Sequence, residues 1–255
     1  MADQTESSSP EDPDQGGRSW RRTFRSWPGY ARASLYVVVV LVLILVAGLV
    51  TGFMLTHRPL PQTSGELEVP GLDGEVTVIR DEFGIPQLYG DSMDDLMRAQ
   101  GFVHAQERFY EMDIRRHLTA GRLSELFGET ALETDEVIRT MGWRRVAQQE
   151  LALVGPDTRA ALEAYSEGVN AYLADRRPSD LGLEYTVLRA GGLDYRPEPW
   201  KPVDSLAWLK AMAWDLRGNM TDEIDRALAL AEHTPAEVRQ LYPPYPYDDH
   251  APVVR

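Results

Sequence analysis

The sequence predicts an α+β protein that is mostly helical and carries one transmembrane helix near its N-terminus. Three features indicate this class: a long uncharged apolar run, short β-like segments separated by turns after it, and a succession of segments with apolar residues at helical spacing. The chain has 255 residues, which is enough for a single domain with appended segments.

The apolar run extends from Leu35 to Leu55 and reads LYVVVVLVLILVAGLVTGFML. As a helix it would be about 31 Å long, which matches a hydrocarbon core of roughly 30 Å. A buried helix of a soluble protein and a cleaved signal peptide are the alternatives. The first normally keeps a polar stripe, and the second has an apolar region of about 7–15 residues. We therefore expect an uncleaved transmembrane signal anchor over residues 34–56.

Arginine residues flank this run unequally. Five arginines precede it and one follows it closely, and no acidic residue lies between Asp14 and Glu66. The excess of positive charge predicts a single-pass protein of the cell membrane, with a cytoplasmic N-terminus and an extracytoplasmic domain. Residues 1–33 are then a disordered, Arg-rich cytoplasmic tail, residues 57–64 a linker and residues 65–240 the main domain.

The composition of the exported part excludes several functions. From Pro59 onward there are 20 Lys and Arg against 35 Asp and Glu, a net charge of −15. So acidic a domain is not expected to bind nucleic acid or anionic membrane surfaces. The chain contains no cysteine, which excludes disulfides, thiolate catalysis and Cys-ligated zinc.

The exported part begins with β-like segments and continues with helices. Turn residues separate short strands expected at residues 67–69, 75–80 and 85–89. Ser92 with Asp95 resembles a capping box that opens a helix reaching His117. Further helices are expected over residues 135–153, from Pro156 onward, from a cap at Asp204 to about Leu216, and from Thr234 onward, followed by an extended Pro- and Tyr-rich tail over residues 241–255.

The helix after Ser92 carries charged residues that allow two interpretations. His104, Glu107 and Glu111 fall at helical spacing and could hold a metal ion on one face. We favour the alternative, in which three arginines pair with three acidic residues and fix the helix to its neighbours: Arg108, Arg115 and Arg116 with Glu107, Glu111 and Asp113. No G-x-S-x-G, H-E-x-x-H, P-loop or G-x-G-x-x-G motif occurs.

Two long segments resemble the penicillin acylase family of N-terminal-nucleophile amidases. They are VIRDEFGIPQLYGDSMDDLMRAQGFVHAQERFYEMDIRRHLTAGRLSELFG, from Val78 to Gly128, and PWKPVDSLAWLKAMAWDLRGNMTDEIDRALA, from Pro199 to Ala229. The resemblance implies a four-layer αββα sandwich, of which this chain supplies the mostly helical α-chain part and a few strands. It also implies hydrolysis of small N-acyl amides such as penicillins or acyl-homoserine lactones, without an organic cofactor.

In this family a precursor cuts itself, and the new N-terminal serine of the β-chain becomes the nucleophile, with its own amine as base. Such a cut usually follows glycine, and none of the 20 glycines here precedes Ser, Thr or Cys. We therefore expect no catalytic residue in this chain, an obligatory β-chain partner, and no activity of the chain alone. The tail from residue 241 would lead toward a spacer and that β-chain. The alternative is a non-catalytic, membrane-anchored binding domain or a truncated gene product.

The resemblance also implies three binding residues. Glu223 fits the position of a glutamate that helps to hold a structural calcium ion shared with the β-chain, and Asp222 competes with it for this role. Arg217 and Trp214 fit the acyl-binding segment, although Gly218 stands where a bulky aromatic residue often lies. The alternative for this segment is a helix end packed on the core.

Overall fold

The computed structural model describes residues 27–251, which divide into one unit up to Leu60 and a second unit from Pro61 onward. The predicted cytoplasmic tail up to residue 26, with four of its five arginines, lies outside the described residues, as do the last four residues of the predicted extended tail.

The first unit is the apolar helix α2, Gly29–His57, which is longer at both ends than the predicted span. Pro28 directly precedes the first turn of α2. At the other end the Arg58 N–H donates a hydrogen bond to the Met54 carbonyl, and Pro59 follows, where a helix cannot continue. None of its residues is buried, and its most apolar window has a mean hydropathy of 3.0. By length and composition α2 is able to cross a membrane, a character that signal sequences share.

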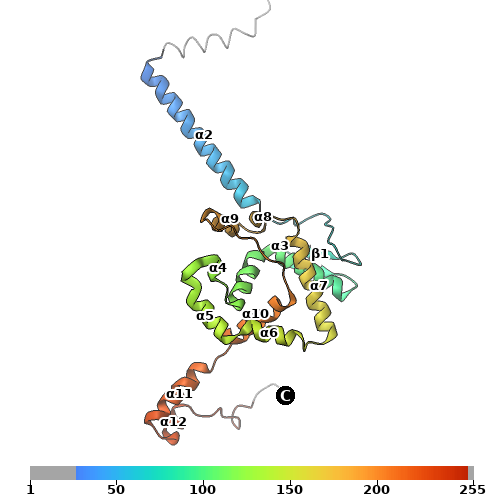
Figure 1. Cartoon of the computed structure of the whole chain (residues 1–255), viewed down its shortest axis with the longest axis vertical. Helices are drawn as coiled ribbons and strands as arrows, with labels where there is room; N and C mark the ends of the chain where they lie inside the picture. Colours follow the sequence, from blue (N-terminus) through green and yellow to red (C-terminus); the bar gives the residue numbers. More distant parts are fainter. Residues whose placement is uncertain (1–26, 252–255) are drawn as a thin grey trace, which may run out of the picture. The chain divides into compact units, whose positions relative to one another are not determined.

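The second unit opens with a two-stranded antiparallel sheet (Figure 1). Strands β1, Thr77–Arg80, and β2, Pro86–Tyr89, pair with Val78 opposite Leu88, which confirms two of the three predicted strands. The Asp81 carboxylate holds the turn by accepting hydrogen bonds from the N–H groups of residues 83 and 85, both at 2.9 Å. The predicted strand at residues 67–69 is wrong, since Val69 packs against the helical core instead of joining the ladder.

Helix α3, Met93–Ala120, is the central element of the unit. The Ser92 hydroxyl caps it by accepting a hydrogen bond from the Asp95 N–H, as predicted. The reciprocal half of the capping box is wrong: the Asp95 carboxylate accepts hydrogen bonds from the N–H groups of Asp73 at 3.0 Å and Gly74 at 3.1 Å. Asp95 therefore ties the turn before β1 to the start of α3.

The chain continues with nine further α-helices and one 3-10 turn in the described residues. They are α4 Ser124–Phe127, η1 Gly128–Ala131, α5 Leu132–Met141, α6 Trp143–Leu151, α7 Pro156–Leu173, α8 Pro178–Leu181, α9 Leu183–Ala190, α10 Pro202–Asp215, α11 Met220–Glu232 and α12 Pro235–Leu241. The predicted helix start at Thr234 is confirmed, and Thr234 forms a capping box there with Glu237.

Two predicted helix boundaries are corrected. The single helix expected over residues 135–153 is broken into α5 and α6 by Gly142, whose φ of 71° is left-handed. Asp204 is not the N-cap of α10 but lies in its first turn, where its carboxylate accepts a hydrogen bond from the Lys201 N–H at 2.8 Å. In both cases the local backbone conformation sets the helix boundary, and the spacing of apolar residues predicts the helical segment itself correctly.

Helix α3 packs against both α7 and α10, and α10 also packs against α6 (Figure 1). The main core lies between α3 and α7, is completed by α8, α9 and the segment before α10, and contains Phe102, Phe109, Met112, Val169, Tyr172, Tyr185 and Trp200. Two glycines bring α3 and α7 unusually close. A Cβ added to Gly101 would lie 2.1 Å from the Tyr165 carbonyl oxygen, and one added to Gly168 would lie 1.8 Å from that of Arg98. This crossing therefore depends on both glycines.

The C-terminal helices leave apolar side chains exposed. On α10, Leu209 is 56% exposed and Met212 is 40% exposed, and Leu216 directly after it is 73% exposed. Helix α11 has no buried residue, and its Leu228 is 65% exposed. We call these side chains, with Ile224 and Leu241, the C-terminal apolar surface. Exposed apolar side chains gathered in one stretch of sequence are typical of a protein interface.

Candidate functional site

The three residues predicted to bind substrate or metal lie in one short stretch around the α10–α11 connection. Trp214 is in the last turn of α10, Arg217 follows the helix end, and Glu223 is in the first turn of α11. The structure places all three in or beside the C-terminal apolar surface, with Trp214 half-buried and the other two exposed.

Arg217 and Trp214 form a cation–π pair. The guanidinium carbon of Arg217 lies 3.3 Å from the centroid of the Trp214 ring, and its Nη1 donates a hydrogen bond to the Trp214 carbonyl oxygen. On α6, the Trp143 ring lies 6.2 Å from the Trp214 ring. Gly218 stands where the family often has a bulky aromatic residue. A Cβ added there would meet no atom within 4 Å, so this position adjoins open space.

Glu223 is held by its own helix start. Its Oε1 accepts a hydrogen bond from the Asn219 side-chain amide at 2.6 Å, and its N–H donates to the Asn219 carbonyl at 2.9 Å. Among residues 27–251, no group of three or more His, Cys, Asp or Glu side chains is arranged to hold a metal ion. Glu223 thus offers a single carboxylate, whereas a calcium ion takes about six to eight oxygen ligands.

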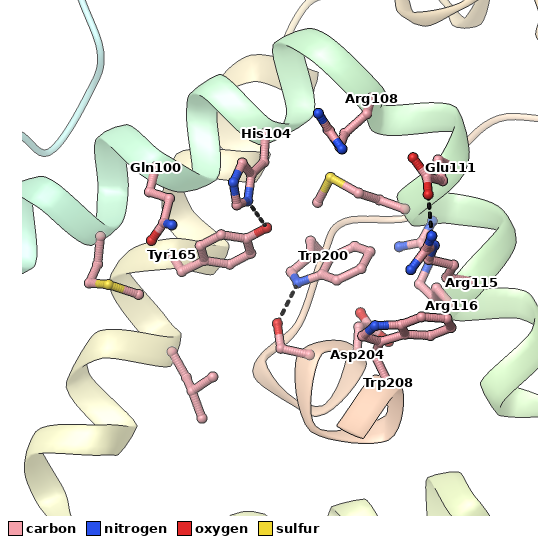
Figure 2. A pocket seen from close by; sticks show the side chains of 14 residues that line it. Gln100, His104, Arg108, Glu111, Arg115, Arg116, Tyr165, Trp200, Asp204 and Trp208 are labelled. Carbon is pink, nitrogen blue, oxygen red and sulfur yellow. Dashed lines mark hydrogen bonds and ion pairs between the residues drawn. The ribbon is translucent and has the colours of Figure 1, made fainter. Parts of the chain in front are cut away.

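The structure also contains a pocket that sequence reasoning did not predict. It has a volume of about 460 Å³ and lies between α3, α7 and the start of α10 (Figure 2). Its apolar walls are formed by Met97, Met112, Leu162, Trp200 and Trp208. Three polar side chains of α3 line it at successive turns: Gln100, His104 and Arg108. The sequence shows these three residues as polar interruptions of an apolar helix face. It does not show the pocket, because the two tryptophans come from a segment far along the chain.

His104 is fixed by Tyr165 of α7. The Nδ1 atom of His104 and the hydroxyl of Tyr165 are 3.0 Å apart (Figure 2). Burial, helped by the nearby Arg108 guanidinium, lowers the pKa of His104, whereas the Glu107 carboxylate acts in the opposite direction. Burial raises the pKa of Tyr165 to about 12. Both side chains are therefore neutral at pH 7, and Tyr165 is able to donate its proton to Nδ1 while His104 Nε2 carries the ring proton.

The metal interpretation of α3 is wrong, because its three side chains have other partners. His104 bonds Tyr165, Glu107 pairs with Arg80 of β1 at 2.7 Å, and Glu111 pairs with Arg115. The favoured alternative is confirmed in the pairing of Arg115 with Glu111 and of Arg116 with Asp113, although both pairs lie within α3 and do not themselves join it to a neighbour. It is wrong for Glu107, whose partner lies on β1, and for Arg108, which has no carboxylate within ion-pair distance among residues 27–251.

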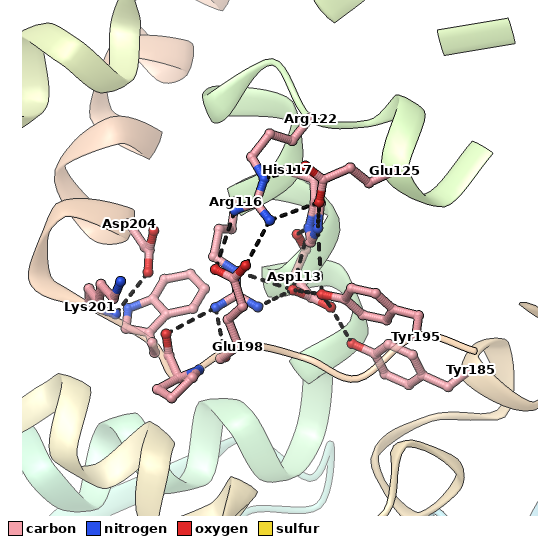
Figure 3. Close-up of polar contacts among 12 residues, drawn as sticks. Asp113, Arg116, His117, Arg122, Glu125, Tyr185, Tyr195, Glu198, Lys201 and Asp204 are labelled. Carbon is pink, nitrogen blue, oxygen red and sulfur yellow. Dashed lines mark hydrogen bonds and ion pairs between the residues drawn. The ribbon is translucent and has the colours of Figure 1, made fainter. Parts of the chain in front are cut away.

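A buried polar network around Asp113 of α3 joins segments that are distant in the sequence (Figure 3). The Asp113 carboxylate accepts hydrogen bonds from the hydroxyls of Tyr185, at 2.8 Å, and Tyr195, at 2.9 Å, and from the Arg116 guanidinium. Arg116 also donates to the Glu198 carbonyl at 2.9 Å. Burial and the Asp113 charge raise the pKa of both tyrosines, which keeps them protonated as donors. Within residues 27–251 every buried side-chain nitrogen or oxygen has a hydrogen-bond partner, so this satisfied network holds the fold together.

Known proteins resemble the chain over most of its length. The Penicillin amidase family matches residues 75–248. The chain is 39% identical over 171 residues to the penicillin acylase 2 proenzyme of Pseudomonas sp. (strain SE83), covering 67% of this chain and 21% of that protein. It is 36% identical over 197 residues to the acyl-homoserine lactone acylase QuiP of Pseudomonas aeruginosa, covering 76% of this chain and 22% of that protein.

A solved structure agrees with the sequence matches. The thermostable penicillin G acylase from Alcaligenes faecalis aligns with a TM-score of 0.52 at 29% identity, covering 66% of this chain and 89% of that chain. The mostly helical unit with its small sheet therefore has the fold of this part of a penicillin acylase. The chain spans about a fifth of the length of the curated relatives it matches. This chain belongs to the penicillin amidase family.

Proposed function

We propose that this chain is the α-chain part of an exported amidase that hydrolyses the C–N bond of linear N-acyl amides. The observation that carries the proposal is membership of the penicillin amidase family over residues 75–248. Relatives named penicillin acylase and acyl-homoserine lactone acylase favour penicillins or acyl-homoserine lactones as the substrate class. In the proposed reaction a serine attacks the amide carbonyl, the amine leaves, and water releases the acid.

The proposal assigns the nucleophile to a β-chain with an N-terminal serine. No glycine of this chain precedes Ser, Thr or Cys, and the C-terminal apolar surface offers a large area for such a partner. The two-stranded sheet supports the same idea, because an isolated two-stranded ribbon is only marginally stable and its edges are free to pair with further strands. The αββα sandwich would be completed by those strands.

Within this complex we assign the acyl group to the Trp214–Arg217 pair. The Trp214 ring offers an apolar wall that Trp143 supports, and the Arg217 guanidinium beside it offers hydrogen-bond donors. The residues for calcium are Glu223 and, as a neighbour in the same turn, Asp222. Calcium takes about six to eight oxygen ligands, so these carboxylates would serve it only together with β-chain oxygens. When bound, the ion would join the two chains and take no part in the chemistry.

We propose that α2 is a signal anchor that holds the domain outside the cytoplasm. The arginines before the span and the length of α2 support this orientation. Protease added to spheroplasts should then remove a C-terminal tag and spare an N-terminal one, and the reverse pattern would contradict the orientation.

Amidase activity tests the proposal. The full chain alone should not hydrolyse N-acyl amides, because water would have to attack an unactivated carbonyl. Co-expression with the nucleophile-bearing region of a family relative should give hydrolysis that disappears when that region's N-terminal serine becomes alanine. In the assembled enzyme Arg217→Ala should raise KM by about tenfold. Glu223→Ala should weaken the assembly of the two chains in a calcium-dependent way. The control variant Arg189→Ala should change neither KM nor assembly.

Robust turnover by the full chain alone, lost on substituting one of its own serines, would contradict the missing nucleophile. A cooperatively folded chain that neither assembles nor gains activity with any family region would favour a non-catalytic, membrane-anchored binding domain instead.

A further inference from the structure

The pocket between α3, α7 and α10 has the construction of a small-molecule site. Its volume of about 460 Å³ lies within the range of about 300–1,000 Å³ typical of ligand pockets. Two tryptophans form part of its walls, and both are fixed: Trp200 Nε1 donates a hydrogen bond to Ser205 Oγ at 3.2 Å, and Trp208 is stacked by Arg115, whose guanidinium carbon lies 4.2 Å from the ring centroid. The apolar part of the pocket is therefore preformed.

The acidic side chains in this pocket are already neutralised. The Asp204 carboxylate accepts hydrogen bonds from Arg144 Nη1 at 2.6 Å and from the Lys201 N–H at 2.8 Å. Glu111 pairs with Arg115. These contacts leave little acceptor capacity directed at a ligand, so the pocket does not suit an amine or a metal cation.

The donors of the pocket, in contrast, remain available. In the described part of the chain, Arg108 has no carboxylate within ion-pair distance, and its side chain extends along the pocket beside His104 (Figure 2). When the Tyr165 hydroxyl donates to Nδ1, His104 presents Nε2–H to the pocket, and Gln100 one turn earlier adds an amide. The three donors lie at i, i+4 and i+8 on α3.

Arg108 also marks an interruption of α3. Its φ of −150° and ψ of 34° are not helical, so α3 bends at this residue. Irregular turns inside helices recur at functional sites, because they redirect side chains and free backbone groups from the helical ladder. The bend gives the Arg108 guanidinium a direction that a regular helix would not provide.

We propose that this pocket binds a small monocarboxylate with an aromatic or branched aliphatic body. The carboxylate would take the Arg108 guanidinium and His104 Nε2–H, and the body would lie against Trp200 and Trp208. A single negative charge fits better than a polyanion, because the exported part as a whole carries a net charge of −15. Neither Trp214 nor Arg217 lines this pocket, so the inference does not depend on amide hydrolysis.

Isothermal titration calorimetry on the full chain in detergent micelles tests this proposal, with 2-naphthoate as the probe. We expect saturable 1:1 binding of 2-naphthoate. The isosteric neutral 2-naphthamide should bind at least about tenfold more weakly, because it cannot form the charge-assisted hydrogen bonds. Acetate, which lacks the aromatic body, should also bind at least about tenfold more weakly.

Variants separate the pocket from other arginine sites. Arg108→Gln should weaken 2-naphthoate binding at least about tenfold and leave 2-naphthamide binding unchanged. Arg189→Gln, which removes an exposed arginine outside the pocket, should change neither. Arg108 is exposed, so Arg108→Gln should fold as the parent does, and circular dichroism checks this.

Three results would overturn the proposal: no binding of 2-naphthoate, equal binding of the acid and the amide, or undiminished binding by Arg108→Gln. Loss of binding on assembly with the remaining region of a family relative would mean that a polypeptide segment fills the pocket, and would overturn it too.

Discussion

Replacing Asp113 by alanine should lower the free energy of unfolding by about 3–5 kcal/mol, because it leaves the Arg116 charge buried without its partner. Asp113 is 1% exposed and Arg116 is 3% exposed, so water cannot replace the lost carboxylate. The hydroxyls of Tyr185 and Tyr195 would also lose their acceptor. Thermal unfolding followed by circular dichroism should show a loss of at least about 6 °C, at about 2–4 °C per kcal/mol.

An exposed ion pair on the same helix provides the matched control. Glu111→Ala removes the partner of Arg115, but both side chains are accessible to water. Its effect on the free energy of unfolding should stay within about 1 kcal/mol. If Asp113→Ala were as mild as Glu111→Ala, the buried network would not join α3 to the segment after α9 in the way the structure describes.

Gly168→Ala should destabilise the protein by about 3 kcal/mol, although alanine is the better helix former. Helix propensity alone would predict a gain of about 1 kcal/mol for this change inside α7. The added Cβ, however, would lie 1.8 Å from the carbonyl oxygen of Arg98, and a backbone atom cannot turn away as a side chain can. Helices α3 and α7 must then move apart, which opens the core around Phe102 and Val169.

Urea unfolding of the two glycine variants Gly168→Ala and Gly218→Ala tests this point. Gly218 has no atom within 4 Å of an added Cβ, and its substitution should change the free energy of unfolding by less than about 0.5 kcal/mol. A stable Gly168→Ala protein would contradict the close crossing of α3 and α7.

The elements that the sequence predicts correctly are those with a local cause. The apolar run, the Ser92 cap, the hairpin around Asp81 and the Thr234 capping box depend on residues within a few positions of one another. Apart from the two helix boundaries, the errors arise where a partner that is distant in the sequence decides the contact. Asp95 bonds the turn before β1 rather than its own N-cap, and Glu107 bonds β1 rather than α3. Neither partner can be inferred from helical spacing.

The two candidate sites also differ in whether local or distant residues form them. Arg217 and Trp214 are three residues apart, so their contact follows from helical spacing at the end of α10. The pocket between α3, α7 and α10 combines α3 with Trp200 and Trp208, which lie about a hundred residues later, and only the packing of α3 against α10 brings them together. The helices α8, α9 and α11 were missed because they are short or lack a buried face.

We propose that the C-terminal apolar surface is covered by the remaining polypeptide of an amidase. Because the chain has no cysteine, a single Leu209→Cys substitution reports on this surface alone, and Glu163→Cys on the exposed polar face of α7 is its control. A maleimide should label both rapidly in the chain alone. On assembly with the nucleophile-bearing region of a family relative, labelling at position 209 should slow by at least about tenfold while labelling at position 163 stays unchanged. Equal labelling of position 209 before and after assembly would contradict the claim.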